Sequence, residues 1–488
     1  MQIFALENDF FLRKLNARKI LKSPGNLRHK HHPHTVAAFR LWRGFAAMPC
    51  IAPGLIKKRK DNLLFHKNNF LSRAFLLFPI LQNVCFFDKI ISMNFIFVSP
   101  NFPHTYWNFC DRLKKNGVNV LGIGDAPYYT LEPQLQECLT EYYFVNNMDD
   151  YDKMYRAVAF FAFKYGKIDW LESNNEYWLE QDAHLRSDFN IATGIGADGI
   201  ADWKHKFNMK KFYAAAKIPS ARCHKISTKS EAKKFLDEVG FPVIVKPDNG
   251  VGALDTWKIS CDEDFEKFFE NPPEVQYVME EFITGEIYSY DVIADSKCEP
   301  LFESSSVFPP SVMDIVNKKL DLAYFTIPEV PEQLRKFGRA ALKSFGVKSR
   351  FVHMEFFRLT KAKKGIGNVG DFAGLEVNMR PAGGYTPDMM DFAHSTDVYQ
   401  IWADMVVHDK RILPDSGEHN FCVYAARRDC HEYVHSHEEV VQKYGDSLVM
   451  CERMPEGISA TMGNQMYTIK AKSESEKDEF LGFVLEKK

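Results

Sequence analysis

The sequence lacks paired cysteines. Its ten cysteines include no CxxC pair and follow no regular spacing over 488 residues. Zinc modules and disulfide-rich secreted domains depend on such patterns. We therefore expect reduced thiols and a cytoplasmic protein, and the sequence argues against a structural zinc site.

The sequence also lacks a long hydrophobic run. The apolar stretch AFLLFPILQNVCFF, at residues 74–87, is shorter than the roughly 20 residues that span a bilayer. It also lies too far from the first residue to be an ordinary signal peptide. We therefore predict no membrane-spanning segment and no membrane partner.

Three common catalytic signatures are missing as well. The first predicted strand of the acidic region runs into SPNFPHTYW rather than GxGxxG, so the sequence gives no support to a dehydrogenase. No GxSxG motif is present, and no cysteine has the surroundings of a nucleophile. No internal repeat or low-complexity tract is evident. A covalent protein nucleophile is therefore not expected.

The charges are unevenly distributed. The net charge is −2, but residues 1–92 carry +12 and residues 93–488 carry −14. A basic region can bind nucleic acid, yet these basic residues form no helical stripe, and HKHHPH (29–34) matches no ligand pattern. We expect no nucleic-acid partner.

We predict that residues 1–92 are a targeting segment or a translated leader outside the functional fold, which expression of residues 93–488 alone would test.

Residues 93–201 alternate short apolar runs with helix-like segments. FIFVS, VNVLGIG, YYFVN and IDWLESNN read as strands, with helices around 106–115 and 151–165. This alternation predicts a parallel sheet with helices on both faces.

The following region mixes helices with strands that contain charged residues. A lysine-rich helix is expected from about residue 202 to a point before Pro219, and an amphipathic helix ends at Gly240. FPVIVKPDNGVGALDTWKI predicts a strand, a glycine loop and a second strand, and VQYVMEEFITGEIYSYDVIAD predicts two strands around a turn at Gly285. Two further strands are expected in SRFVHMEFFRL and in GLEVNMRPAGG.

Polar residues interrupt these strands where apolar ones are expected. In GLEVNMRPAGG, Glu376, Asn378 and Arg380 alternate, so they share one face of a strand. Glu355 interrupts another strand, and Lys246 lies in an otherwise apolar one, where its ammonium must reach solvent or an anion. Such misplaced polar residues are expected at functional sites.

This set of side chains suits phosphoryl transfer. Glu355, Glu376 and the oxygen of Asn378 are hard ligands of the kind that Mg²⁺ prefers, and Mg²⁺ takes few protein ligands. Arg380 and Lys246 offer cations to phosphates. DNGVG, at residues 248–252, can turn its amides toward an anion. Catalysis of this kind relies on electrostatic placement.

Four motifs in order carry a family resemblance: FPVIVKP with its glycine loop, VMEEFITGE, HMEFF and LEVNMRPAGG. Together they resemble the ATP-grasp superfamily, in particular its carboxylate–amine ligase branch, with an ATP-binding domain like that of the carbamoyl-phosphate synthase large chain. The resemblance covers about residues 93–415. It implies an α/β and α+β architecture, with a parallel pre-ATP-grasp domain, a two-lobed ATP-grasp fold and a small C-terminal α+β segment. The expected parts are residues 1–92 (leader), 93–201 (pre-ATP-grasp domain), 202–287 (small lobe), 288–411 (large lobe) and 412–488 (C-terminal segment).

The resemblance also implies roles for individual residues. Arg380 and Lys246 are the implied catalytic cations, and the implied metal ligands are Glu355, Glu376 and Asn378. The implied ATP-binding residues are Lys206, Lys246, the lid residues Gly250, Val251, Gly252 and Ala253, the linker residues Glu280, Glu281, Phe282 and Ile283, and the ribose ligand Glu286. Lys204 and Lys210 remain alternatives to Lys206. The family spacing places the ribose ligand where this chain has Ile287.

The implied cofactors are ATP and Mg²⁺, with Mn²⁺ as an alternative metal. In the implied reaction, a carboxylate attacks the γ-phosphate to give an acyl phosphate and ADP, and an amine then displaces phosphate. A closing lid would protect the acyl phosphate from water. The implied partners are small-molecule carboxylates and amines, with a homodimer left open. Transfer to a thiol, kinase-type transfer and nucleotide binding without turnover are the alternatives.

Two further segments remain open. SNNEYW, at residues 173–178, follows a predicted strand and can face the same cleft, because open α/β sheets bind ligands at the carboxyl ends of strands. YTPDMMDFAHSTDVY, at 385–399, is either part of an acceptor pocket or a plain helix start, the latter being favoured. His353 shares a strand face with Glu355 and is expected to be a supporting or core histidine.

Overall fold

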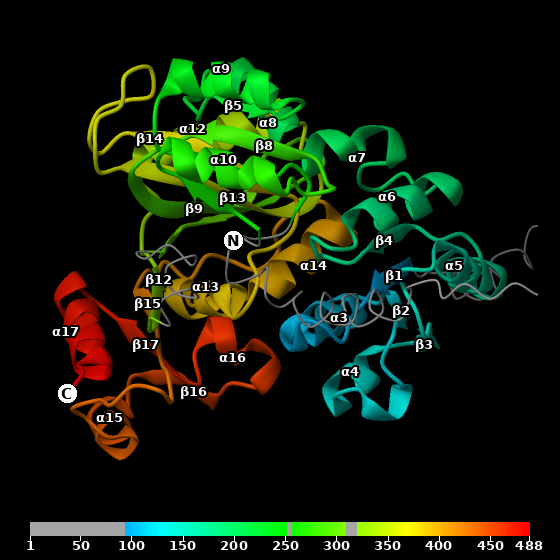
Figure 1. Cartoon of the computed structure of the whole chain (residues 1–488). Helices are drawn as coiled ribbons and strands as arrows, with labels where there is room; N and C mark the ends of the chain where they lie inside the picture. Colours follow the sequence, from blue (N-terminus) through cyan, green and yellow to red (C-terminus); the bar gives the residue numbers. More distant parts are fainter. Residues whose placement is uncertain (1–92, 251–254, 309–319) are drawn as a thin grey trace, which may run out of the picture. The chain divides into compact units, whose positions relative to one another are not determined.

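The computed structural model describes residues 93–250, 255–308 and 320–488. The first sheet has four parallel strands in the order β3-β2-β1-β4 (blue to teal in Figure 1). Its strands are β1 (Asn94–Val98), β2 (Asn119–Gly124), β3 (Glu141–Phe144) and β4 (Trp170–Glu172). The parallel sheet expected from the alternating pattern is confirmed.

Helices cover both faces of this sheet because its strands are apolar on both sides. The helices are α3 (Trp107–Lys115), α4 (Pro133–Cys138), α5 (Tyr151–Tyr165) and α6 (Leu179–Asp188). Phe95 and Phe97 of β1 pack with α3 and α4 in one buried cluster, whereas Ile96 and Val98 pack with α5 and α6 in another. The alternation of side chains along β1 thus serves two cores.

The second sheet is small and antiparallel, with the order β5-β8-β6-β7. Its strands are β5 (Cys223–Lys225), β6 (Val243–Pro247), β7 (Trp257–Ile259) and β8 (Tyr277–Glu281). Helices α9 (Lys229–Val239) and α10 (Asp262–Glu270) bury Leu236, Phe265 and Phe268 against it. Lys246 therefore lies on an interior strand of this sheet.

The third sheet carries most of the remaining chain, in the order β14-β13-β9-β11-β12-β15-β17-β16, with β10 also paired to β9. The first group of strands is β9 (Gly285–Ala294), β10 (Pro300–Ser304), β11 (Ser306–Phe308), β12 (Leu322–Thr326), β13 (Arg350–Leu359) and β14 (Phe372–Asn378). The strands near the C-terminus are β15 (Phe421–Arg427), β16 (Leu448–Arg453) and β17 (Gln465–Ala471). The strands expected in the C-terminal segment form, and they extend this sheet instead of making a separate one, since β15 pairs with β12.

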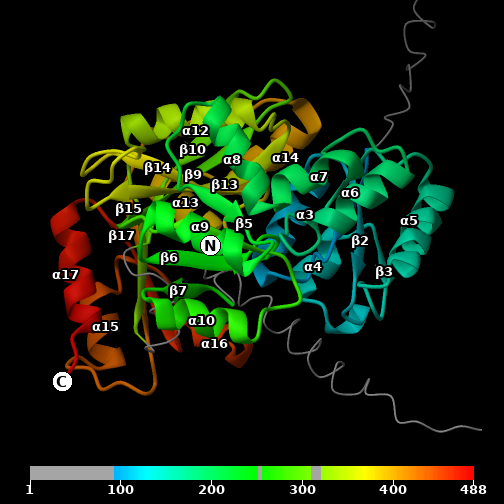
Figure 2. The same ribbon diagram turned by 45° about the horizontal axis from the view of Figure 1, so that its top comes forward.

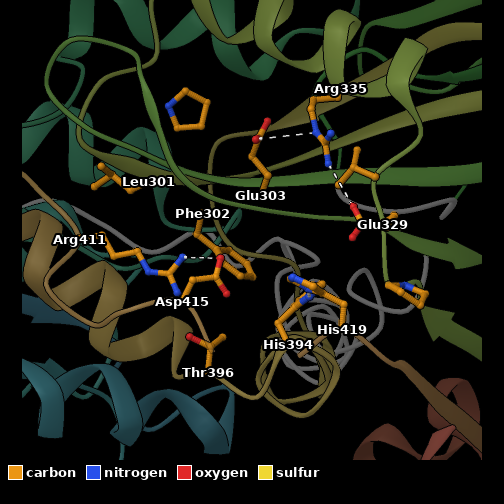
Figure 3. Close-up of a pocket in the computed structure, with 13 residues that line it drawn as sticks. Leu301, Phe302, Glu303, Glu329, Arg335, His394, Thr396, Arg411, Asp415 and His419 are labelled. Carbon is orange, nitrogen blue, oxygen red and sulfur yellow. Dashed lines mark hydrogen bonds and ion pairs between the residues drawn. The ribbon is translucent and has the colours of Figure 1, made fainter. Parts of the chain in front are cut away.

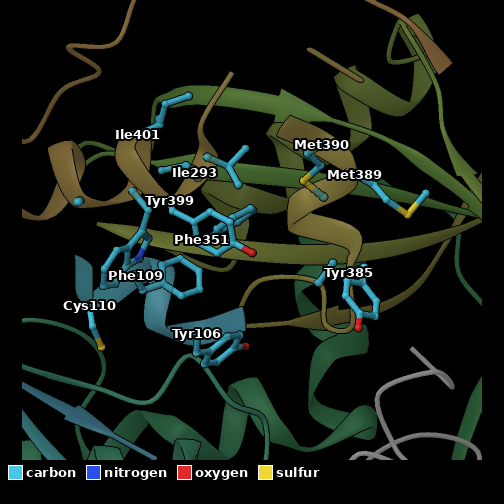
Figure 4. Packing of buried hydrophobic residues seen from close by; sticks show 14 of the residues in the cluster. Tyr106, Phe109, Cys110, Ile293, Phe351, Tyr385, Met389, Met390, Tyr399 and Ile401 are labelled. Atoms are coloured by element: carbon cyan, nitrogen blue, oxygen red, sulfur yellow. The ribbon is translucent and has the colours of Figure 1, made fainter. Parts of the chain in front are cut away.

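The large sheet has helices on both faces. On one face, α7 (Ala197–Lys204), α8 (Lys206–Ala215) and α12 (Glu332–Ser344) pack against even-numbered residues of β13 such as Met354 and Phe356. On the other face, α13 (Thr386–His394) and α14 (Val398–His408) pack with Phe351, Ile293 and helix α3 of the first sheet (Figure 4). One continuous core therefore joins the first sheet to the large sheet.

Three helices follow β15 in the chain. They are α15 (His437–Tyr444), α16 (Glu456–Met462) and α17 (Glu474–Leu485), and α15 and α17 lie beside β15 and β17 (Figure 2). Val440, Phe480 and Val484 are buried against these strands. The boundaries expected between the parts of the chain remain predictions.

One expectation about local structure is wrong. The lysine-rich segment forms two helices, because His205 adopts an extended conformation between α7 and α8. The two strands expected around Gly285 form, and β8 belongs to the small sheet whereas β9 belongs to the large one. Among the described residues, no helix combines the length and apolar character required to cross a bilayer.

Candidate active site

Two of the predicted metal ligands face each other across neighbouring strands. Glu355 of β13 is the direct partner of Glu376 on β14, and His353 is the partner of Asn378. Directly opposed residues on antiparallel strands project their side chains to the same face. The register therefore brings Glu355, Glu376 and Asn378 together, and all three are buried.

A second carboxylate supports this row from the adjacent strand. His353 Nδ1 lies 2.6 Å from Asp291 Oδ1 on β9, and its Nε2 lies 3.2 Å from Glu355 Oε1. Burial opposes the charge on His353, but Asp291 and Glu355 raise its pKa above the usual value. His353 thus joins Asp291 to Glu355, as expected of a supporting histidine.

Helix α8 holds Lys206 over these carboxylates. Lys206 Nζ lies 3.2 Å from Glu376 Oε1 and donates to the carbonyl oxygen of Gly250 at 2.8 Å. The helix can pack this closely because Gly374 of β14 has no side chain: a Cβ there would lie 2.6 Å from the Tyr213 ring of α8. Of the three lysines considered, Lys206 is the one with a short contact to a predicted metal ligand.

The break between α7 and α8 is fixed by a residue of the glycine-loop segment. Asp248 Oδ1 accepts a hydrogen bond from the backbone N–H of Phe207, and Oδ2 lies 2.9 Å from His205 Nδ1. The Asp248 carbonyl also accepts from the Lys206 N–H at 3.0 Å. A carboxylate in this position satisfies open N–H groups at a helix start. Asp248 therefore places Lys206 beside the end of β6.

Two lysines share the carboxylate of Glu280. Lys210 Nζ lies 2.6 Å from Glu280 Oε1, and Lys246 Nζ lies 2.7 Å from Oε2. Burial opposes ionisation of Glu280, but Lys210 and Lys246 lower its pKa to about 2. Burial likewise opposes the charge on Lys246, but Glu280 and then Glu376 raise its pKa. Lys246 and Glu280 of the small sheet, Lys210 of α8 and Glu376 of the large sheet therefore belong to one electrostatic cluster.

The predicted linker residues occupy the crossing from β8 to β9. The Glu281 carboxylate points to a different group from Glu280, since Arg222 donates to it from both its backbone and its side chain. The carbonyl of Phe282 accepts from Lys363 Nζ at 2.6 Å, and Ile283 is buried. The structure thus holds this linker between Arg222 and Lys363, while only Glu280 faces the lysines of the cluster.

Glu286 lies apart from the other predicted residues. In β9 it pairs with Arg358, whereas Ser289 pairs with Glu355. Because successive side chains alternate between faces, Glu286 projects to the face opposite Glu355, and Ile287 projects to the same face as Glu355. The geometry disfavours Glu286 as a ligand of the same site. Of the predicted lid residues, Gly250 is described, and Val251, Gly252 and Ala253 lie outside the described residues.

Arg380 lies just beyond β14, where it meets the first sheet. Its Nε is 3.5 Å from Glu176 Oε2, and its Nη1 donates to the carbonyl of Pro381 at 2.9 Å. Lys204 Nζ contacts the same glutamate, 3.2 Å from Oε1 and 2.8 Å from the backbone carbonyl. Lys204 is therefore committed to Glu176, which argues against it as the lysine that contacts ATP.

The metal-binding prediction can be tested against the donor set. Among the described residues, no cluster of three or more His, Cys, Asp or Glu side chains is arranged to hold a metal ion. Two carboxylates and an amide nevertheless fit Mg²⁺, which takes few protein ligands. Glu376 Oε2 is buried and accepts no hydrogen bond from the described part of the chain. Such an oxygen is available to a hard cation.

A separate cavity lies elsewhere in the large sheet. Its volume is about 320 Å³, and it opens beside β10, with His394 and His419 on one side and Arg335 and Arg411 on others (Figure 3). Burial, and then His419, lower the pKa of His394 to about 4. None of the predicted site residues lines this cavity, so it is distinct from the candidate active site.

Sequence reasoning missed three residues that shape the site. Asp291 carried no recognised signal, and Asp248 was included only as part of the DNGVG loop, although each is a buried carboxylate in or beside a strand. Glu172, at the end of β4, is buried at 3% exposure between Arg186 and Arg350. An acidic residue at the end of an apolar strand is the sequence signal that points to Glu172.

Comparisons with known proteins find a family model that matches part of the chain and solved structures with a similar fold. The family model of the ATP-grasp domain matches residues 204–308, which include Lys206, Lys246 and Glu280. No curated protein sequence matches the chain.

Several solved structures share the fold. One is N5-carboxyaminoimidazole synthetase from Staphylococcus aureus complexed with ADP (TM-score 0.58, 13% identity, 80% of this chain and 97% of that chain). Another is L-amino acid ligase from Bacillus licheniformis (TM-score 0.57, 13% identity, 80% and 96%). A third is the biotin carboxylase domain of 2-oxoglutarate carboxylase from Hydrogenobacter thermophilus with MgADP, ADP and bicarbonate (TM-score 0.56, 14% identity, 77% and 86%). At these identities the likeness establishes the fold.

Proposed function

Given that this chain contains an ATP-grasp domain on an ATP-grasp fold, we propose that it is an ATP- and Mg²⁺-dependent ligase. It activates a small-molecule carboxylate as an acyl phosphate, releases ADP and joins the acyl group to an amine. One observation carries the proposal: Glu355 and Glu376 oppose each other across β13 and β14, and Lys206 lies 3.2 Å from Glu376. Similar structures include a synthetase in complex with ADP and a biotin carboxylase domain in complex with MgADP, which supports the same cofactors.

Each group has a defined role in this proposal. Glu355, Glu376 and Asn378 hold magnesium, which neutralises phosphate charge when it is bound. Lys206 and Lys246 contact the phosphates, because both ammonium groups lie at the carboxylate cluster that ATP and metal would enter. Arg380 stabilises negative charge on the transferred phosphoryl group and on the attacked carbonyl. The linker Glu280 to Ile283 borders the adenine site.

The order of events follows from the charges. In the structure, Lys206 pairs with Glu376, and Lys210 and Lys246 pair with Glu280. Nucleotide phosphates give the lysines new partners and leave the carboxylates to the metal. The carboxylate substrate then attacks the γ-phosphorus, and ADP leaves with the bridging oxygen. The amine attacks the acyl carbon, phosphate departs, and the amine loses a proton.

A screen of ADP release tests the proposal. The full-length protein is incubated with MgATP and pairs of carboxylic acids and amines, and ADP is measured by a coupled assay. Hydroxylamine is then offered in place of the amine, because only an acyl phosphate gives a hydroxamate. Hydroxamate formation with an acid that also stimulates ADP release supports the ligase. Acid-independent phosphorylation of an alcohol or a thioester product would replace it with one of the alternative reactions.

A further inference from the structure

The loop that follows β4 brings a carboxylate to the candidate active site from the first sheet. The loop covers residues 173–178, and five of its six residues are buried. Asn174 has φ +52°, in the left-handed region that asparagine tolerates. Its carbonyl accepts from Tyr106 Oη at 2.6 Å, and the Ser173 N–H donates to Asp182 at 2.9 Å. The loop is therefore held in one conformation by contacts within the first sheet and its helices.

Glu176 is the residue of this loop that reaches the large sheet. It is 8% exposed, and its Oε2 lies 3.5 Å from Nε of Arg380, which is itself 3% exposed. The other carboxylate oxygen lies 3.2 Å from Lys204 Nζ. A buried guanidinium retains its charge and a fixed orientation when a carboxylate faces it.

A second contact fixes the backbone that carries Arg380. Glu172, four residues before Glu176, forms an ion pair with Arg350 at the start of β13. Arg350 Nη1 in turn donates to the carbonyl of Met379 at 2.8 Å. Met379 directly precedes Arg380. Glu172, at the end of β4, therefore acts on the main chain beside Arg380, and Glu176, in the loop after β4, acts on its guanidinium.

We propose that Glu176 is the positioning residue for Arg380: it aims the guanidinium at the phosphoryl group and so makes the first sheet part of the reaction centre. The inference rests on the proposed function of Arg380 but adds a role for a residue outside the ATP-grasp lobes. Glu176 acts through Arg380, and it exchanges no proton or phosphoryl group. In this arrangement the loop after β4 determines, through Glu176 and Arg380, the position of a bound phosphate.

The test uses inorganic phosphate as the probe, because phosphate is a product of the proposed reaction whatever the acid or amine. MgADP affinity and phosphate affinity at saturating MgADP are measured by calorimetry for the wild type and for Glu176→Gln. Residues that orient the ligands of a metal ion are typically worth ~10- to 100-fold in metal affinity, and we use the lower end of this range for a residue that orients an arginine. We expect phosphate affinity to fall by at least ~10-fold in Glu176→Gln, with MgADP affinity changed less than ~2-fold.

A matched variant and a double variant separate positioning from general damage. Glu141→Gln on β3 also removes a carboxylate paired with a lysine, Lys164, and should leave phosphate binding unchanged. Arg380→Gln should weaken phosphate binding at least as much as Glu176→Gln does, and adding Glu176→Gln to it should cause no further loss, because residues acting as one unit are not additive. An additive loss in the double variant would overturn the inference.

The remaining outcomes are also decisive. If Glu176→Gln does not fold, Glu176→Asp keeps the charge but shortens the side chain, and it should weaken phosphate binding while leaving MgADP binding intact. Unchanged phosphate affinity in a folded Glu176 variant overturns the positioning role. If the wild type binds no MgADP at all, the proposed function has failed, and that result is distinct from failure at Glu176.

Discussion

Lys206 Nζ lies 3.2 Å from Glu376 Oε1, so the predicted phosphate-binding lysine faces a predicted metal ligand. Both side chains are buried, at 5% and 4% exposure. Two opposite charges at this distance attract and stabilise each other. Bound MgATP would supply each with a new partner, which explains how so many charges can be buried at one site.

This pair leads to the first prediction. Glu376→Gln keeps the size of the side chain but removes the charge that attracts a cation. We expect ADP release to fall by at least ~10³-fold, because transition-state charge is no longer neutralised, while circular dichroism and thermal unfolding show a folded protein. The matched control is Glu479→Gln, which alters an exposed glutamate paired with Lys443 on the surface. Undiminished ADP release by Glu376→Gln would contradict the metal assignment.

The strands of the site could be predicted from the sequence, whereas the contacts between them could not. Alternation places Glu376 and Asn378 on one face of a strand. The register that sets Glu355 opposite Glu376 depends on how β13 pairs with β14, and these two residues are 21 positions apart in the sequence. The break at His205 escaped prediction because its cause, Asp248, lies 43 residues away. Glu286 was assigned although the family spacing falls on Ile287, and strand alternation puts Glu286 on the face opposite Glu355.

Lys246 and Lys210 provide the second prediction, because they contact the same carboxylate from different elements. Lys246 is in β6 of the small sheet and Lys210 is in α8. Loss of one buried charge partner typically costs ~2–5 kcal/mol. We expect Lys246→Met to weaken MgATP binding by at least ~30-fold, from the same range of energies.

Binding of MgATP can be followed by calorimetry or by displacement of a fluorescent nucleotide. Lys211→Met is a matched control, because Lys211 follows Lys210 in α8 but pairs with Asp202 at the surface. Equal affinities for Lys246→Met and the wild type would remove Lys246 from the nucleotide site.

The third prediction concerns the core between the first sheet and the large sheet. Trp402 of α14 is 2% exposed, and the centroid of its ring lies 4.9 Å from the ring centroid of Phe109 and 5.7 Å from that of Phe95. Trp402→Ala should lower the free energy of unfolding by ~3–5 kcal/mol, the usual cost of removing a buried large aromatic. Trp257→Ala, at a site 38% exposed, should cost ~1 kcal/mol or less. Similar costs for both variants in urea denaturation would contradict the packing described for α14.

Glu280 makes stability depend on pH, which is the fourth prediction. Burial opposes its ionisation, but Lys210 and Lys246 lower its pKa in the folded protein to about 2, against an ordinary value of 4.5. A lowered carboxyl pKa stabilises the fold fully above the unfolded pKa, and that contribution is lost as the pH falls from about 4.5 toward 2. The difference corresponds to ~3 kcal/mol.

Glu280→Gln cannot titrate, so its free energy of unfolding should fall less steeply than that of the wild type between pH 5 and pH 2.5. Urea denaturation at half-unit steps of pH gives the two curves. Glu479→Gln, at an exposed glutamate, should follow the wild-type curve. A carboxyl group whose pKa is the same in the folded and unfolded protein adds nothing to the pH dependence of the free energy of unfolding. Parallel curves for the wild type and Glu280→Gln would therefore show that Lys210 and Lys246 do not hold the ionised carboxylate in the folded protein.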